Sequence, residues 1–215
     1  MPFDPKTTAV VITDPQNDFL SPEGVTWELV GASVTENRTV EHLEQLISGA
    51  KAAGYRVFVS PHYYFPTDDD WKIRGTVEGL MHDIGMFQRT GSLTLEGFDG
   101  SGADWVDPLG KFINDGETIV TSPHKAYGPQ SNDLTLQLRK RGITTVVLAG
   151  MSANLCVEAH MRQLVEDGFE VHVVTDATAA ARHPELGDGY EAALVNFRYV
   201  ASGVSTTDEA LASLS

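Results

Sequence analysis

The chain has 215 residues, with 30 acidic against 15 basic side chains, a formal net charge of −15 and one cysteine. This length is enough for one α/β domain with its own core. The acidic balance offers no basic surface for a phosphate backbone or for anionic lipids, so we expect neither nucleic acid nor a membrane as partner. A single cysteine excludes an internal disulfide, and no signal sequence or long apolar run is evident, so we expect a cytoplasmic protein.

Short β-branched runs alternate with longer segments of helical period, which predicts an α/β fold with a mostly parallel sheet and helices on both faces. Strands are expected at 8–13, 55–60, 117–121, 144–149 and 169–175, with a short one near Val204. Helices are expected from Ser33, where Ser33 and Glu36 have capping-box spacing, to about Gly54, and over 131–141, 153–167 and 187–199. We interpret residues 1–215 as one domain.

The segment at about 61–116 breaks this pattern. It is rich in glycine and in large aromatic side chains. Because so long a connection inside a compact domain is either disordered or functional, its aromatic content favours an ordered lid or a subunit interface. A surface excursion that packs its aromatic side chains on itself is the alternative.

Three reactive side chains follow predicted strands: Asp14, Lys125 and Cys156. Ligands of open parallel sheets bind at the carboxyl ends of the strands, so these residues are the first candidates for chemistry. Cys156 is expected in the first turn of a helix, where the dipole favours a thiolate by ~0.3–1 kcal/mol. Since one pKa unit needs about 1.4 kcal/mol, a neighbouring base or cation is also required, and Asp14 and Lys125 fit those roles.

Each residue also has an ordinary interpretation. A lone cysteine beside an apolar strand is commonly a small buried hydrophobe, an aspartate before proline commonly forms a turn, and a lysine is commonly solvated. The functional interpretation gains weight because an acid, a cation and a thiol all fall on the same predicted edge of the sheet.

Four motifs in order resemble the isochorismatase-like cysteine hydrolase superfamily, which includes nicotinamidases and N-carbamoylsarcosine amidases. They are Asp14-Pro15-Gln16-Asn17-Asp18-Phe19, Lys125 after a strand, the segment Gly150 to Val157 with Cys156, and Asp176-Ala177. The resemblance implies a three-layer α-β-α fold around a six-stranded, mainly parallel sheet.

For the site, the resemblance implies a catalytic triad in which Cys156 attacks a carbonyl, Asp14 takes the thiol proton and Lys125 stabilises the anion. It implies an oxyanion hole formed by the backbone N–H groups of Ser152 and Cys156, after a cis peptide bond at Met151-Ser152. It also implies a homodimer or homotetramer.

We expect Gln16, Phe19, His62 and Tyr127 to line the substrate pocket. No cofactor is expected. No metal is expected either, because the Asp-x-His pattern of metal-binding nicotinamidases is absent after the second strand, so His62, His124 and His160 are interpreted as hydrogen-bonded residues.

The leading hypothesis is therefore a cysteine-dependent hydrolase that cleaves the C–N bond of a small amide, carbamoyl or ureide substrate through a thioester. Because the true isochorismatases of the superfamily replace the cysteine, Cys156 favours C–N cleavage over isochorismatase-type hydrolysis of another small molecule. Two alternatives stay open: a catalytically silent binding or assembly domain, and a redox-responsive thiol protein, for which no resolving cysteine exists.

Overall fold

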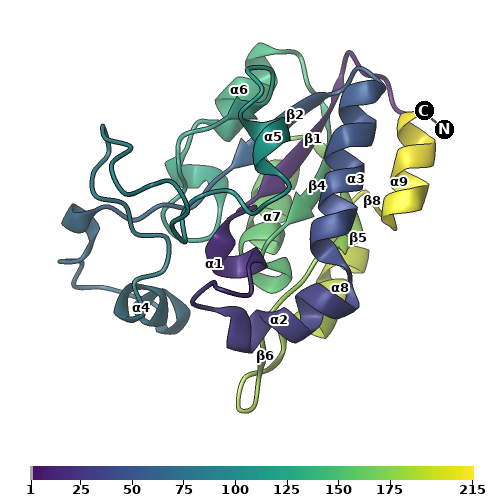
Figure 1. Cartoon of the computed structure of the whole chain (residues 1–215). Helices are drawn as coiled ribbons and strands as arrows, with labels where there is room; N and C mark the ends of the chain where they lie inside the picture. Colours follow the sequence, from purple (N-terminus) through teal and green to yellow (C-terminus); the bar gives the residue numbers. More distant parts are fainter. Residues whose placement is uncertain (1) are drawn as a thin grey trace.

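A single parallel sheet forms the centre of the computed structural model, which describes residues 2–215 (Figure 1). Within that range six strands are ordered β3-β2-β1-β4-β5-β8, and every neighbouring pair is parallel. The predicted α/β fold with its six-stranded sheet is thereby confirmed. The strands are β1 (Thr8–Thr13), β2 (Arg56–Ser60), β3 (Ile119–Val120), β4 (Thr145–Gly150), β5 (Glu170–Thr178) and β8 (Gly203–Ser205), and β6 (Arg182–His183) pairs with β7 (Gly187–Asp188) in a separate hairpin.

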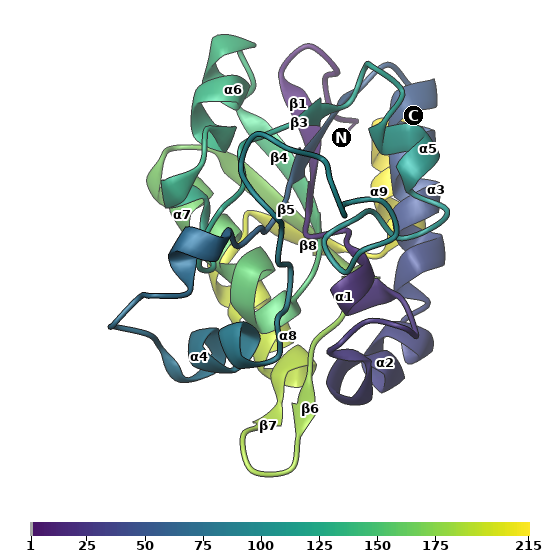
Figure 2. The ribbon, with the colours of Figure 1, turned by 60° about the vertical axis from the view of Figure 1, so that its left-hand side comes forward.

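Helices cover both faces of the sheet, which gives the three layers (Figure 2). One face carries α2 (Trp27–Glu36), α3 (Thr39–Ala52) and α9 (Thr207–Leu214), and the other carries α6 (Leu134–Lys140), α7 (Glu158–Glu166) and α8 (Gly189–Val200). The shorter helices are α1 (Asn17–Leu20), α4 (Thr76–Asp83) and α5 (Gly110–Ile113). No helix in residues 2–215 has the length and apolar character needed to cross a membrane.

The strands are buried on both faces because successive side chains alternate between the two helical layers. In β1, Val10 and Ile12 pack with the α3 side, whereas Ala9 and Val11 pack with α6 and α7. All four are fully buried. Continuous apolar strands of this kind are what the sequence pattern predicted for a parallel sheet.

One local prediction is wrong. No helix starts at Ser33: this residue lies inside α2, and the break falls at Arg38, which adopts a left-handed backbone (φ 49°) immediately before α3. The Ser33 hydroxyl instead accepts a hydrogen bond from the backbone N–H of Ala180, a long-range contact that no local pattern reveals.

Cys156 lies in a π-helical turn (Ala153–Val157) that leads directly into α7, so it falls in the first turn of this helical segment, as predicted.

The segment at 61–116 contains α4 and α5 and lies beside the carboxyl ends of β1 and β2 (Figure 1). Polar side chains of the first loop fasten it there. The Asp18 carboxylate accepts a 2.6 Å hydrogen bond from the backbone N–H of Phe87, and the Asn17 side chain donates to the carbonyl of Ser101. Tyr64 and Phe87 are fully buried. The segment therefore contributes to the core as well as to the surface.

Candidate active site

The candidate site lies where the strand order reverses, between β1 and β4. Asp14 directly follows β1, and Cys156 follows β4 after a short turn. At such a switch point the two neighbouring loops diverge toward opposite faces of the sheet and leave a crevice, which is where open α/β sheets bind ligands. The topology thus brings together two residues that are 142 positions apart in the sequence.

The backbone at Asp14 is strained. Its φ of 45° lies in the left-handed region, which an L-residue other than glycine adopts at a cost. The backbone N–H donates to the carbonyl of Ser60 at the end of β2 and thereby holds the turn. Strained positions of this kind persist where the surroundings enforce them and cluster at functional sites.

Gly150 allows β4 to end close to β1. Its φ is 114°, and a Cβ atom at this position would lie 2.1 Å from the carbonyl oxygen of Thr13. Thr13 and Met151 then exchange two hydrogen bonds of 2.9 Å, one from the Thr13 hydroxyl to the Met151 carbonyl and one from the Met151 N–H to the Thr13 carbonyl. Only glycine fits this approach, so the position of the next residues depends on it.

The turn after β4 presents the thiol. The peptide bond between Met151 and Ser152 is cis. Cys156 is 2% exposed, and its burial together with the nearby Asp14 carboxylate raises the pKa of the thiol well above its usual range. The backbone N–H groups of Ser152 and Cys156 act in the opposite direction and favour the anion at the sulfur.

Asp14 is fully buried, and this burial raises its pKa from 3.8 to about 6. Neighbouring His62, the Cys156 thiol and His160 favour the carboxylate and limit the rise. A carboxylate with a pKa near 6 is ionised at neutral pH and is a stronger base than an exposed aspartate. It is therefore suited to accept a proton from a thiol.

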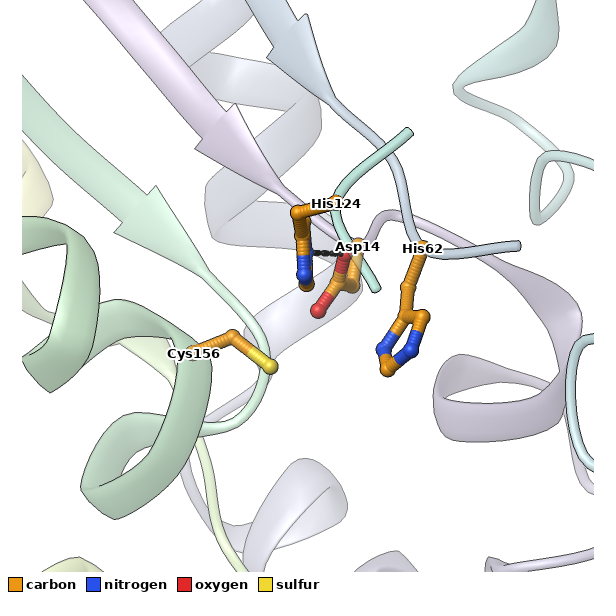
Figure 3. A group of neighbouring side chains, drawn as sticks. All are labelled: Asp14, His62, His124 and Cys156. Carbon is orange, nitrogen blue, oxygen red and sulfur yellow. Dashed lines mark hydrogen bonds and ion pairs between the residues drawn. The ribbon is translucent and has the colours of Figure 1, made fainter. Parts of the chain in front are cut away.

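His124 is the residue after β3 that contacts Asp14. Its Nε2 lies 2.8 Å from Asp14 Oδ1 (Figure 3), and both side chains are fully buried. Burial lowers the pKa of His124 to about 3, so the imidazole is neutral near pH 7 and the contact is a hydrogen bond donated by Nε2–H to the carboxylate. His124 was interpreted from the sequence only as a hydrogen-bonded residue.

The structure pairs Lys125 with a residue of the 61–116 segment, and its predicted role beside Asp14 and Cys156 stays a prediction. The ammonium group binds the Asp68 carboxylate (Nζ–Oδ2 2.5 Å) and lies 3.7 Å from the centre of the Phe65 ring. The reason is strand geometry: His62 and His124 form a parallel bridge beyond β2 and β3, so the next residue, Lys125, projects to the other side. The sequence carried one signal for this arrangement. If side chains alternate along the extended chain after β3, His124 and Lys125 face opposite sides, and His124 is the one on the side of His62.

Two residues predicted to line the pocket have different roles. His62 lies in the site: its ring is 4.6 Å from that of His124, and its Nε2 donates to the carbonyl of Lys125. Gln16 is fully buried, and its predicted place in the substrate pocket stays a prediction. Its side chain donates to the carbonyls of His62 and Ala103 and accepts from the N–H of His62, so it fastens the 61–116 segment to β1.

Phe19 and Tyr127 line surface pockets. Phe19 belongs to an apolar pocket whose lining includes Ser152 and Leu155 as well as Val77 and Leu80 of α4. Helix α4 of the 61–116 segment thus forms part of the wall next to the Ser152 turn. Tyr127, half-buried, borders a separate hollow with Leu155 and its neighbours.

His160 supports the site from behind. Its Nδ1 lies 2.7 Å from the carbonyl of Cys156, and its Nε2 lies 2.8 Å from the Ser60 hydroxyl. Since the carbonyl only accepts, the ring proton lies on Nδ1 and the Ser60 hydroxyl donates to Nε2. His160 therefore links the end of β2 to the π-helical turn, and its prediction as a hydrogen-bonded residue agrees with these contacts.

Comparison with known proteins shows the family to which this chain belongs. The Isochorismatase domain family matches residues 8–209. Ureidoacrylate amidohydrolase RutB of Methylorubrum extorquens is 28% identical over 98% of this chain and 85% of its own length, and the RutB of Caulobacter segnis is 30% identical over 96% and 85%. The chain belongs to the isochorismatase family.

Solved structures agree on the fold. A cysteine hydrolase from Pseudomonas syringae pv. phaseolicola superimposes with a TM-score of 0.79 at 22% identity, covering 100% of this chain and 95% of that one. N-carbamoylsarcosine amidase from Thermoplasma acidophilum gives 0.66 at 21% identity, covering 94% and 97%. The predicted superfamily and the predicted hydrolase class are confirmed by these matches.

Proposed function

We propose that this protein is a cysteine-dependent hydrolase that cleaves the C–N bond of a small amide, carbamoyl or ureide substrate through a thioester. The observation that carries the proposal is the buried pair of Cys156 and Asp14 at the switch point. Full-length relatives named as amidohydrolases support the reaction class.

In the proposed reaction, the Cys156 sulfur attacks the substrate carbonyl while its proton passes to Asp14. The N–H groups of Ser152 and Cys156 stabilise the oxyanion. Asp14 then gives the proton to the departing nitrogen, the C–N bond breaks and a thioester remains. Water hydrolyses the thioester with Asp14 as base, which restores the thiol.

We assign the supporting role at Asp14 to His124, and Lys125 is not required beside the thiol. The Nε2–H of His124 occupies Asp14 Oδ1 at 2.8 Å and thereby orients the carboxylate. His124 is a positioning residue in this proposal, since it acts on the substrate only through Asp14.

The test is an ammonia- or amine-release screen over amides, carbamoyl compounds and ureides, with Cys156→Ala as the matched variant. We expect at least one substrate for which the variant loses ~10⁴-fold or more in kcat/KM while its circular dichroism spectrum is unchanged. Wild-type-like turnover by Cys156→Ala overturns the proposal.

A second readout uses the fact that the chain has one cysteine. Iodoacetamide should modify one site per chain by mass spectrometry, and activity should fall in proportion to that modification. Acid quench during turnover should trap an acyl adduct on the peptide that contains Cys156. Full alkylation with full activity retained shows that Cys156 is not the nucleophile and overturns the proposal.

A further inference from the structure

Four buried side chains with metal-ligating atoms meet at the candidate site: Asp14, His62, His124 and Cys156. One such atom from each lies within 4.8 Å of the others. Figure 3 shows the Cys156 sulfur, the Asp14 carboxylate and the rings of both histidines directed toward one another from four different loops. The proposed reaction gives no task to His62.

Part of this cluster lacks hydrogen-bond partners. Within residues 2–215, Asp14 Oδ2 and His62 Nδ1 are buried and have none. Because the Lys125 carbonyl can only accept, the ring proton of His62 lies on Nε2, and Nδ1 carries a lone pair. Leaving buried acceptors without a donor is unfavourable, so the cluster favours a cationic ligand.

We propose that this cluster binds one divalent transition-metal ion, with Zn²⁺ as the best fit, and that the bound ion blocks Cys156 as a nucleophile. One thiolate, one carboxylate and two imidazoles are a donor set that zinc takes in tetrahedral sites, whereas Ca²⁺ and Mg²⁺ prefer oxygen. The thiolate and the carboxylate together neutralise the charge of the ion, which suits a buried site.

Binding forms four metal–ligand bonds and breaks the S–H bond of Cys156, and the thiol proton leaves to solvent. His62 binds through Nδ1, and His124 binds through Nε2 with its ring proton on Nδ1. Ligand atoms in such a site lie roughly 3.5 Å apart, so the side chains close by about 1 Å.

This inference rests on the same site as the proposed function and deepens it by adding control of the thiol. It departs from the expectation that no metal binds, which was drawn only from the missing Asp-x-His pattern. That pattern describes one particular ligand arrangement, whereas here the topology assembles a different one from four loops.

The test uses the full chain, treated with a chelator and then titrated with Co²⁺ or Zn²⁺ alone. We expect one Co²⁺ per chain, with a near-ultraviolet sulfur-to-cobalt charge-transfer band and intense visible bands of tetrahedral cobalt. Zn²⁺ added to the metal-free protein should release about one proton per ion near pH 7, whereas Zn²⁺ added to the cobalt-loaded protein should displace the cobalt without further proton release. Cys156→Ser should abolish the charge-transfer band, and His62→Asn should weaken binding ~100-fold or more, at least the loss seen for outer-shell partners.

His82→Asn is the matched control. His82 is also a buried histidine whose ring nitrogens have no hydrogen-bond partner in the described chain, but it lies against Tyr64 and Trp71, outside the cluster. This variant should bind Co²⁺ as the wild type does. Absence of stoichiometric binding, a cobalt spectrum without the sulfur band, or undiminished affinity in His62→Asn overturns the inference.

Activity separates the two proposals. One equivalent of Zn²⁺ should suppress ammonia release, and a chelator should restore it. Metal binding in a protein that turns over no substrate leaves the metal site standing and removes the proposed function. Turnover without metal binding leaves the proposed function standing and removes the metal site. Full turnover by the zinc-loaded protein shows that the bound ion does not block Cys156.

Discussion

The carboxyl edge of β1 and β4 and the segment at 61–116 meet at the candidate site but are held by different forces. At the strand edge, close backbone contacts at Gly150 and Thr13 set the geometry. The 61–116 segment is held by side chains that reach over long sequence distances, such as Asp18 to Phe87 and Lys125 to Asp68. The comparison indicates that the strand edge supplies the reactive atoms, whereas the segment supplies the wall around them.

The largest expected effect is on stability and tests the close backbone contact between Gly150 and Thr13. Gly150→Ala places a Cβ atom 2.1 Å from the Thr13 carbonyl and forces a positive φ on alanine. We expect a loss of ~4 kcal/mol or more in the free energy of unfolding, measured by urea denaturation.

Gly142→Ala is its control, since Gly142 also has a positive φ (72°) but its added Cβ meets nothing within 4 Å. It should cost only ~1–2 kcal/mol. Equal losses in the two variants would show that the close approach at the strand edge is not what fixes the site.

The next effect separates His124 from its neighbour. His124→Asn removes the Nε2–H donor to Asp14, and we expect kcat/KM to fall ~10²-fold through misplacement of the carboxylate. His124→Gln can place an N–H near the same position and should recover part of this loss. Lys125→Met should stay within about 3-fold of the wild type, because the ammonium group is paired with Asp68 in a partly exposed ion pair.

If Lys125→Met is as inactive as Cys156→Ala, the assignment to His124 is wrong. Such a result would mean that the ammonium group leaves Asp68 during the reaction, and that the 61–116 segment takes part in the chemistry.

A third effect concerns the cost of burying Asp14. Its folded pKa of about 6 lies above the unfolded value of 3.8, so the native state binds the proton more tightly and loses stability as pH rises through this window. Asp14→Asn removes that penalty. We expect the variant to be inactive yet more stable than the wild type by up to about 3 kcal/mol at pH 7.5.

The stability gain should shrink toward zero below pH 4, where the Asp14 carboxyl is protonated in both states. Urea denaturation at several pH values in the presence of a chelator measures it, and no gain at pH 7.5 contradicts the buried charge. Since the base must be ionised, the wild-type kcat/KM should also rise with pH through about 6.

The smallest effect lies in the 61–116 segment. Asp68→Asn weakens the contacts of Asp68 with Lys125 and with the N–H of Phe65. We expect a loss of ~1 kcal/mol or less in global stability, together with faster amide exchange near Phe65. Exchange in β1 and β4 should not change, and acceleration there would show that the two regions unfold as one unit.

The sequence by itself determined the sheet and the shared edge on which Asp14 and Cys156 stand. Continuous apolar runs such as Thr8–Thr13 have one low-energy solution, a buried parallel strand, and the residues that end such strands share one edge. The shared location of Asp14 and Cys156 therefore follows from the strand pattern alone. The prediction of a helix that starts at Ser33 was wrong because the serine hydroxyl accepts a hydrogen bond from the N–H of Ala180, far along the chain, and does not cap a helix.

Only the tertiary structure placed His124 beside Asp14 and Lys125 beside Asp68, gave the Gln16 amide its backbone contacts and brought His62 into the cluster. Each outcome depends on a one-residue alternation or on a contact between loops that are far apart in the sequence, such as the bridge between His62 and His124. Local pattern constrains which face of a strand is apolar, but it does not say which side of an irregular loop a charged side chain takes. That choice is made by the partners that the fold places there, here Asp14 for His124 and Asp68 for Lys125.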